Sequence, residues 1–134
     1  MKTHLLQKLA GAALAVVAAA PVAAKLNSCD GPIVFGTTVS ETGPFSTLAD
    51  RWRKMTEVFA EEVNKTGGVA VKACNKKLPI QFVIYDDQSV PATAVQLYEK
   101  MATVDKVDFF VGPDWSSIGG PVPPIADKYK IPMV

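Results

Sequence analysis

Apolar and polar positions along the chain alternate between short apolar runs and longer stretches with helical spacing. The runs at residues 33–38, 80–85 and 107–111 have the β-branched and aromatic composition of buried strands. Between them, apolar residues recur three or four positions apart, as one face of a helix requires. Strands that alternate with helices form parallel β-α-β units. The sequence therefore predicts an α/β fold with a parallel sheet and flanking helices.

The helical stretches can be placed from their apolar faces and their ends. The first predicted helix ends at a glycine pair, and its apolar face comprises Leu48, Trp52, Met55, Phe59 and Val63. The second begins near a proline, and its apolar face comprises Ala94, Leu97, Tyr98, Met101 and Val104. A third helix is expected from about residues 121–124 to 130, because Gly119 and Gly120 weaken any earlier helix.

Two further segments complete the pattern. Residues 69–78 are short, polar and rich in lysine, which predicts a small hairpin or an irregular loop. Residues 132–134 have the composition of the start of a fourth strand. We interpret residues 25–134 as the amino-terminal part of a longer α/β domain, because the sequence stops where this strand begins.

The amino-terminal segment is typical of a secretory signal peptide. Lys2 and Lys8 give it a positive start, an apolar and alanine-rich run follows at residues 9–24, and small residues stand at 22–24. The alternative is a membrane anchor, but the run is shorter than the ~20 residues that span a bilayer, and Pro21 lies near its end. The prediction is cleavage after residue 24 and export to the periplasm.

The charge balance changes the range of possible functions. The sequence holds 14 basic and 13 acidic residues, two of the lysines lying in the signal peptide, so the exported form has a net charge near zero. Such a balance gives no electrostatic footprint for nucleic acid or anionic lipid. The single histidine, His4, is lost with the signal peptide, which argues against histidine-based catalysis and histidine metal sites.

Cys29 and Cys74 are the two cysteines of the chain. In an exported protein, two well-separated cysteines most often form one disulfide. Each precedes a predicted strand, and parallel neighbouring strands bring their amino ends together, so a bridge is geometrically reasonable. The alternative is a lipoprotein box at residues 26–29, although Lys25 interrupts the apolar run before it and Asn27 is large for that role.

Candidate chemistry lies at the tip that follows the third strand. This tip carries Asp114, Trp115, Ser116 and Ser117, and ligands of open α/β sheets bind outside the carboxyl ends of the strands. The serines either cap a turn or donate hydrogen bonds to a ligand, and Trp115 is either a packing residue or a pocket wall. A nucleophilic serine would need an activating base, which the sequence does not place beside it.

Asp86 and Asp87 end the second strand and raise the possibility of magnesium-dependent phosphotransfer. The only candidate partner for such a site is Asp114. The alternative is structural, with the two carboxylates at the strand end capping the second helix. Neither GxGxxG nor GxxxxGK[ST] occurs, so no nucleotide cofactor is predicted, and no metal is predicted either.

Three segments together resemble the branched-chain amino-acid-binding proteins of ABC importers. They are TGPFSTLADRWRKMTEVFAEEVNKTGGV, IQFVIYDDQSVPA and VGPDWSSIGGPVPPIADKYKIPMV. The resemblance implies a flavodoxin-like first lobe of the type I periplasmic-binding fold, present here as its amino-terminal part. It also implies a binding protein rather than an enzyme, working without a cofactor and as a monomer beside a membrane permease.

The resemblance also assigns roles to individual residues. Ser116, with Ser117, Trp115 and Asp114 as neighbours, corresponds to the loop that holds the carboxylate and ammonium of the ligand. Leu48 stands where the family often has an aromatic side chain over the ligand. The expected function is capture of amino acids or similar small carboxylates between two lobes. The alternative is an exported flavodoxin-like enzyme domain, such as a metal-dependent phosphatase.

Overall fold

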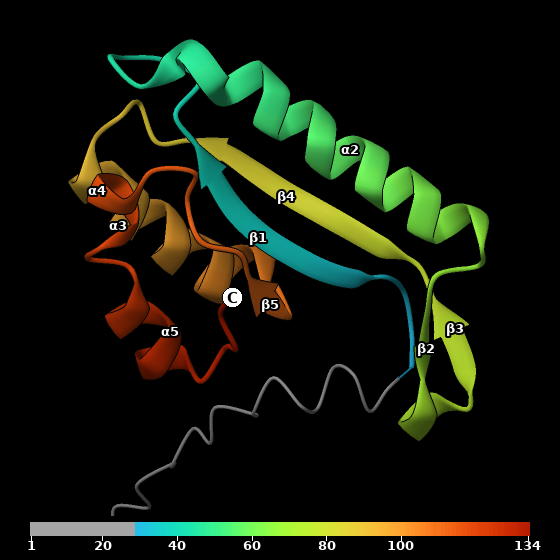
Figure 1. Cartoon of the computed structure of the whole chain (residues 1–134). Helices are drawn as coiled ribbons and strands as arrows, with labels where there is room; N and C mark the ends of the chain where they lie inside the picture. The colour runs from blue at the N-terminus through green and yellow to red at the C-terminus, as the bar shows by residue number, and fades with distance from the viewer. Residues whose placement is uncertain (1–28) are drawn as a thin grey trace, which may run out of the picture.

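A three-stranded parallel sheet forms the centre of the molecule (Figure 1). The computed structural model describes residues 29–134, so the predicted signal peptide lies outside the described residues. The strands are β1 (Ile33–Val39), β4 (Ile80–Asp86) and β5 (Phe109–Phe110), in the order β4-β1-β5. β1 and β4 pair along their whole length, from Ile33↔Ile80 to Val39↔Asp86. The predicted α/β fold with a parallel sheet is confirmed.

The third strand is shorter than the predicted run of residues 107–111. Only Phe109 and Phe110 pair with β1, although backbone hydrogen bonds continue on both sides, from Asp108 N to Val34 O (2.8 Å) and from Val111 N to Gly36 O (2.9 Å). The Val34 N–H itself donates to the Asp108 carboxylate at 2.8 Å. A side chain thus takes the place of a backbone partner at the start of the strand, which shortens it.

The end of the chain forms a single parallel bridge where the start of a fourth strand was predicted. Phe110 and Met133 form a parallel bridge on the side of β5 that faces away from β1. Hydrogen bonds from Phe110 N to Pro132 O and from Gly112 N to Val134 O, each 2.8 Å, hold this segment beside β5.

Helices cover the two faces of the sheet unequally (Figure 1). α2 (Ala49–Lys65), entered through the 3-10 turn η1 (Ser46–Leu48), lies on one face. The other face carries α3 (Pro91–Lys100), the π-helical turn η3 (Met101–Asp105), α4 (Ser116–Gly119) and α5 (Pro123–Tyr129). The larger core lies on this second face, where Tyr98 and Phe110 meet edge to face with ring centroids 4.9 Å apart.

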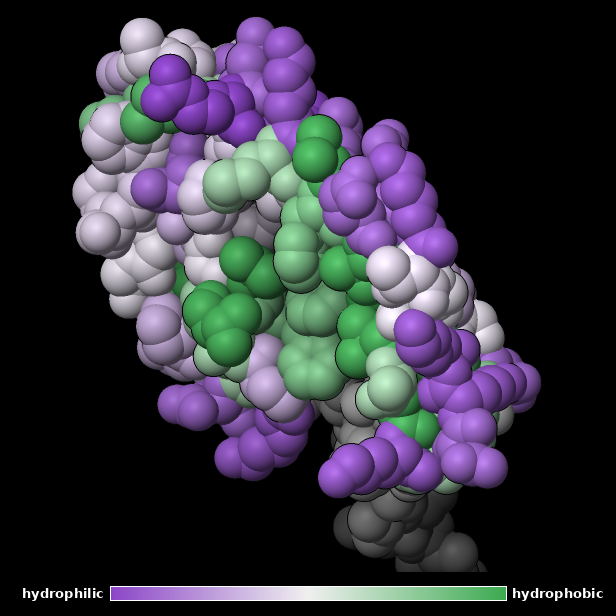
Figure 2. All heavy atoms as spheres, turned by 45° about the vertical axis from the view of Figure 1, so that its right-hand side comes forward, coloured by the Kyte–Doolittle hydropathy of each residue, from purple (hydrophilic) through white to green (hydrophobic). Residues whose placement is uncertain are grey.

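The predicted apolar face of the first helix is only partly buried. Leu48, Met55 and Phe59 are 44%, 52% and 54% exposed, whereas the buried residues of α2 are Ala49 and Thr56. The helix approaches the sheet through small side chains and leaves the larger ones at its flank. Figure 2 shows the resulting band of hydrophobic atoms beside the hydrophilic surface of the helix.

A row of phenylalanine rings lies on the α2 face of the sheet. Phe35 stacks on Phe82 and on Phe109, in both cases with centroids 5.3 Å apart, and Phe59 of α2 meets Phe82 edge to face. The register places these three strand residues side by side, so the row runs across the sheet. Because α2 covers only one end of the row, the rings are half-buried rather than enclosed.

Two other helix predictions need correction. Val104 is 67% exposed and outside the core, because the π-helical turn changes the spacing that placed it on the apolar face. A one-turn helix, α4, forms at Ser116–Gly119, where no helix was expected. This short helix is stable because its buried residue, Ile118, packs in the core.

The segment at residues 69–78 is a hairpin, as one of the two alternatives predicted. β2 (Val69–Val71) and β3 (Lys76–Leu78) pair antiparallel around the 3-10 turn η2 (Lys72–Cys74). Cys74 forms a disulfide with Cys29, with Cα atoms 5.5 Å apart, so the predicted pairing is confirmed. Within residues 29–134, no helix is long and apolar enough to cross a membrane.

Candidate functional site

Three loops meet at the carboxyl ends of the strands and form the candidate site. They are the first loop after β1 (residues 40–48), the acidic loop after β4 (residues 87–90) and the serine loop after β5 (residues 111–117). Their meeting follows from the parallel sheet, in which all three strands point the same way. The Thr37 hydroxyl near the end of β1 donates to Gly112 O of the serine loop at 3.3 Å.

Asp87 joins the acidic loop to β1 from a fully buried position. Its carboxylate accepts hydrogen bonds from the hydroxyls of Thr38 (2.8 Å) and Ser40 (2.7 Å) and from the backbone N–H of Ser89 (2.9 Å). A buried carboxylate is tolerated only when it is hydrogen-bonded in this way. Asp87 therefore fixes the ends of two strands relative to each other.

Asp86, at the end of β4, binds the first loop through exposed hydrogen bonds. It accepts hydrogen bonds from the N–H groups of Glu41 (2.9 Å), Thr42 (3.2 Å) and Gln88 (2.8 Å), and from the Thr42 hydroxyl (2.7 Å). Burial raises the pKa of Asp86, but the hydrogen bonds from Thr42 and Gln88 and the charge of Arg53 outweigh it and hold the pKa below its ordinary value. Arg53 in turn forms an ion pair with Glu41.

The two aspartates do not cap the second helix, which corrects the structural alternative predicted for them. Val90 is the N-cap of α3, and no side chain caps that helix. The carboxylate oxygens are instead turned to the first loop and β1. In the described part of the chain, no cluster of three acidic, histidine or cysteine residues could hold a metal ion.

The acidic and first loops interlock through an unusual backbone. Gln88 and Ser89 have φ angles of 59° and 61°, a left-handed backbone conformation that residues other than glycine rarely adopt. The Ser89 hydroxyl donates to Thr42 O at 2.7 Å and accepts the Phe45 N–H at 3.1 Å. Gly43 has a φ of 85°, and a Cβ there would lie 2.6 Å from Gln88 O, so the contact requires glycine.

Trp115 connects the serine loop to the first loop. Its ring stacks on Phe45, with centroids 4.9 Å apart, and its indole N–H donates to Phe45 O at 3.1 Å. The indole N–H is thus engaged within the protein. Of the two roles predicted for Trp115, packing is the one that these contacts describe, although its half-buried ring still lies next to the serines.

Ser116 and Ser117 begin α4 and are exposed. The first N–H groups of a helix have no partner inside the helix. Here the N–H groups of Ile118 and Gly119 return to Trp115 O, whereas those of Ser116 and Ser117 make no hydrogen bond with the described residues. Both hydroxyls also lack a partner within residues 29–134. The turn therefore presents two amide and two hydroxyl donors to solvent.

Asp114 points into the protein. Both of its carboxylate oxygens are buried and lack a well-formed hydrogen bond within residues 29–134, although the nearby backbone N–H groups of Ser40 and Trp115 act to lower its pKa. Burial, and after it the negative charge of Asp87, raise the pKa of Asp114 above its ordinary value. This side chain is a neighbour of the serine donors along the chain, but its oxygens are not exposed beside them.

Leu48 ends the turn η1 and is exposed. The aromatic side chain of the first loop that reaches the serine loop is Phe45, three positions earlier, which the sequence did not single out. The sequence pattern that could have identified Phe45 is a lone aromatic residue directly after Gly43-Pro44 in a polar loop. Tyr98 was likewise predicted only as core, yet its hydroxyl donates to Val111 O under the serine loop, and burial raises the pKa of this phenol to about 12.

The chain is similar to one protein family and to several solved structures. Residues 32–134 match the family model described as periplasmic binding protein. The branched-chain amino acid transporter substrate-binding protein LivJ from Streptococcus pneumoniae, solved with isoleucine, is similar over 76% of this chain, with 25% identity and a TM-score of 0.66. An extracellular ligand-binding receptor from Rhodopseudomonas palustris HaA2 is similar over 78%, with 25% identity and a TM-score of 0.61.

A third similar structure was solved with a different ligand. A solute-binding protein of an ABC transporter from R. palustris, solved with benzoate, is similar over 77% of this chain, with 23% identity and a TM-score of 0.61. The chain spans only 28% of the length of the streptococcal protein and 26% of that of each protein from R. palustris.

Proposed function

The chain belongs to the periplasmic binding protein family, the substrate-binding proteins of ABC transporters, and from this premise we propose that it captures a small carboxylate for import. The ligand class that we propose is amino acids, foremost branched-chain ones. Delivery to a membrane permease follows from the same proposal, as does export to the periplasm.

The observation that carries this proposal is the set of unpaired donors at the start of α4. The N–H groups and hydroxyls of Ser116 and Ser117 lie on the first two residues of the turn α4, where backbone N–H groups have no partner within a helix. A carboxylate accepts hydrogen bonds and donates none, so its chemistry complements these groups. The neighbouring rings of Phe45 and Trp115 offer apolar surface for the rest of the ligand.

The mechanism that we propose is capture on this lobe followed by closure of a second lobe over the ligand. The three loops fix the serine donors before the ligand arrives, because Asp87 and Trp115 already tie these loops together. A site organised in advance loses less conformational entropy on binding. The fixed half of the site would select the carboxylate, and the second lobe would complete the contacts.

Calorimetry on the intact exported protein tests the proposal, with isoleucine and benzoate as separate ligands. A Ser116→Ala variant should bind the preferred ligand about tenfold to a hundredfold more weakly, because a hydrogen bond to a charged group contributes about 1.5–3 kcal/mol. Thr103→Ala is the matched control, since it removes an exposed hydroxyl from the turn η3, which precedes β5 at the opposite end of the sheet.

The two ligands distinguish an amino-acid receptor from a receptor for other small carboxylates. Isoleucine binding with no benzoate binding supports an amino-acid receptor, and the reverse supports a receptor for carboxylates without an ammonium group. Equal affinity of Ser116→Ala and the unaltered protein for the bound ligand would contradict the role given to the serine loop.

A further inference from the structure

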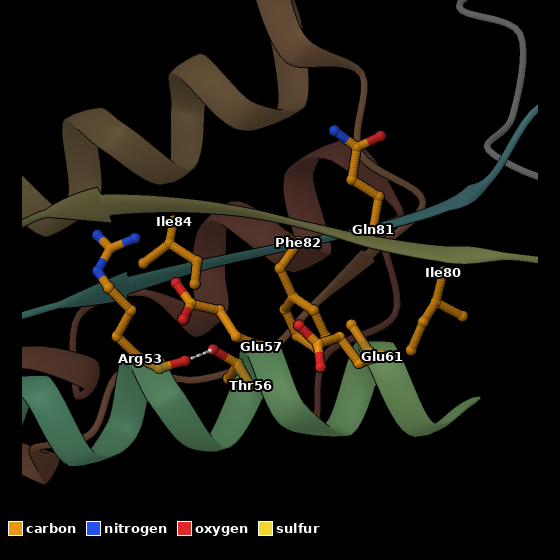
Figure 3. Close-up of a pocket in the computed structure, with 9 residues that line it drawn as sticks. Arg53, Thr56, Glu57, Glu61, Ile80, Gln81, Phe82 and Ile84 are labelled. Atoms are coloured by element: carbon orange, nitrogen blue, oxygen red, sulfur yellow. Dashed lines mark hydrogen bonds between the residues drawn. The ribbon is translucent and has the colours of Figure 1, made fainter. Parts of the chain in front are cut away.

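A groove of 450 Å³ runs between helix α2 and strand β4, apart from the three loops of the candidate site (Figure 3). Phe82 and Ile84 of the strand and Ala60 of the helix give it apolar walls. β4 is an outer strand of the described sheet, since its one partner there is β1. The groove therefore lies beside a sheet edge.

The backbone groups of β4 divide between its partner strand and this edge. Pro79 O accepts the Ile33 N–H, and the Asp87 N–H donates to Val39 O, so odd-numbered positions bond to β1. Groups alternate along a strand, and even-numbered positions therefore face outward. The structure bears this out at Ile80, whose N–H and C=O point to the edge.

Asn64 at the end of α2 occupies that first outward position. Its side-chain oxygen accepts the Ile80 N–H at 2.8 Å, and its side-chain nitrogen donates to Ile80 O at 2.9 Å. The amide thus pairs with the edge as the backbone of a neighbouring strand would. The next outward groups, the N–H and C=O of Phe82 and Ile84, have no hydrogen-bond partner within residues 29–134.

The helix side of the groove is acidic. Glu57 and Glu61 lie one turn apart on α2, and their carboxylates rise into the space below β4 (Figure 3). Neither forms an ion pair with the described residues. Arg53, at one end of the groove, is already paired with Glu41. The groove therefore carries two uncompensated negative charges.

We propose that the edge of β4 is a docking site for an extended segment of a partner protein in which basic and apolar residues alternate. The segment adds a strand, pairing its backbone with Phe82 and Ile84. Its basic side chains face α2, where their aliphatic stems lie on the apolar walls and their charges meet Glu57 and Glu61. Its apolar side chains fall on the opposite face of the sheet, where Val83 and Tyr85 of β4 are only partly buried.

Charge disfavours a second copy of this chain as the occupant. Antiparallel pairing of two β4 edges would place both α2 helices on the same face of the joined sheet. Glu57 and Glu61 of one copy would then approach those of the other, and like charges repel. The proposed occupant supplies the opposite charge.

A peptide of six alternating lysine and valine residues, acetylated and amidated at its ends, tests the proposal on the intact protein. NMR titration should shift the amide signals of Phe82 and Ile84 and slow their hydrogen exchange. A Glu57→Gln/Glu61→Gln double variant should bind the peptide about three- to tenfold more weakly, as two exposed ion pairs allow. Glu62→Gln is the matched control, because Glu62 pairs with Lys65 away from the groove.

Two altered peptides test the pairing and the charge. A peptide N-methylated at every second residue, on the amides that face β4, should lose binding because its backbone cannot hydrogen-bond to the strand. A peptide with glutamate in place of lysine should lose binding because its charges repel Glu57 and Glu61. Binding that survives N-methylation, or shifts confined to residues other than 80–86, would overturn the proposal. So would concentration-dependent dimerisation through β4 in ultracentrifugation.

This docking site does not depend on the proposed ligand site. The Glu57→Gln/Glu61→Gln variant should keep the unaltered affinity for isoleucine or benzoate, so failure of either proposal leaves the other standing.

Discussion

Replacement of Asp87 by alanine should destabilise the protein strongly, because the carboxylate is the buried acceptor on which two loops depend. It accepts three hydrogen bonds, from Thr38, Ser40 and Ser89. Alanine would leave three buried donors without an acceptor, and each unsatisfied buried group costs about 1–3 kcal/mol. Because the two hydroxyls can turn to other acceptors, we expect a total loss of about 3–6 kcal/mol in the free energy of unfolding.

An asparagine at the same position should have a smaller effect. Its oxygen can keep two of the donors, and the Thr38 hydroxyl can rotate to accept from the new amide. The loss is then mainly that of the charge assistance, about 1–2 kcal/mol. We therefore expect stability to rise from the alanine variant to the asparagine variant to the unaltered protein. This order indicates a hydrogen-bonding role, since a role in packing alone would make asparagine harmless.

Urea unfolding of the intact protein measures both variants, with Asp127→Ala on the exposed surface of α5 as the control. Hydrogen exchange adds a local measurement, because the amides of Ser89 and Phe45 should lose protection in Asp87→Ala. An Asp87→Ala variant within about 0.5 kcal/mol of the unaltered protein, the range of ordinary surface substitutions, would refute the reasoning.

Two further predictions concern pH and the disulfide. Asp114→Asn should raise the urea midpoint at pH 7, because the raised pKa of Asp114 means that its charged form is disfavoured in the folded state. The gain should vanish below about pH 4, where the carboxyl is neutral in the folded and the unfolded state. An equal gain at pH 3 would contradict this cause. Loss of the Cys29–Cys74 bridge, across a sequence separation of 45, should lower the free energy of unfolding by about 4 kcal/mol, and an unchanged urea midpoint in Cys29→Ala/Cys74→Ala would contradict this.

The sequence was sufficient for the order of the parallel strands and of the helices α2, α3 and α5, because each strand of the parallel sheet is marked by a local apolar run. β1 and β4 begin where their apolar runs begin, and the helices follow turn signals that glycine and proline provide locally. The disulfide was predictable for the same reason, since two parallel strands bring the segments before them together. Local pattern and sheet topology were enough for these features.

Features that depend on contacts between distant loops were not predictable. Phe45 and Trp115 lie 70 positions apart, and no local pattern announces that one stacks on the other. The exposure of Met55 and Phe59 depends on how much of the sheet α2 covers, which a helical period cannot state. The sequence placed Asp86 and Asp87 correctly at a strand end but assigned them the nearest helix, whereas their partners belong to β1 and the first loop.

The distribution of polar groups at the site separates structural from ligand-binding residues. Asp86, Asp87, Ser89 and the indole N–H of Trp115 all bond to other parts of the chain. Each of these bonds joins two loops, or joins a loop to a strand of the sheet. The donors of Ser116 and Ser117 make no such bonds with the described residues. Donors that are held in place and left unpaired stabilise a bound anion without first breaking a bond within the protein. The aspartates that suggested phosphotransfer thus have a structural role, because they fix the first loop, and Trp115 of the serine loop bonds to that loop at Phe45.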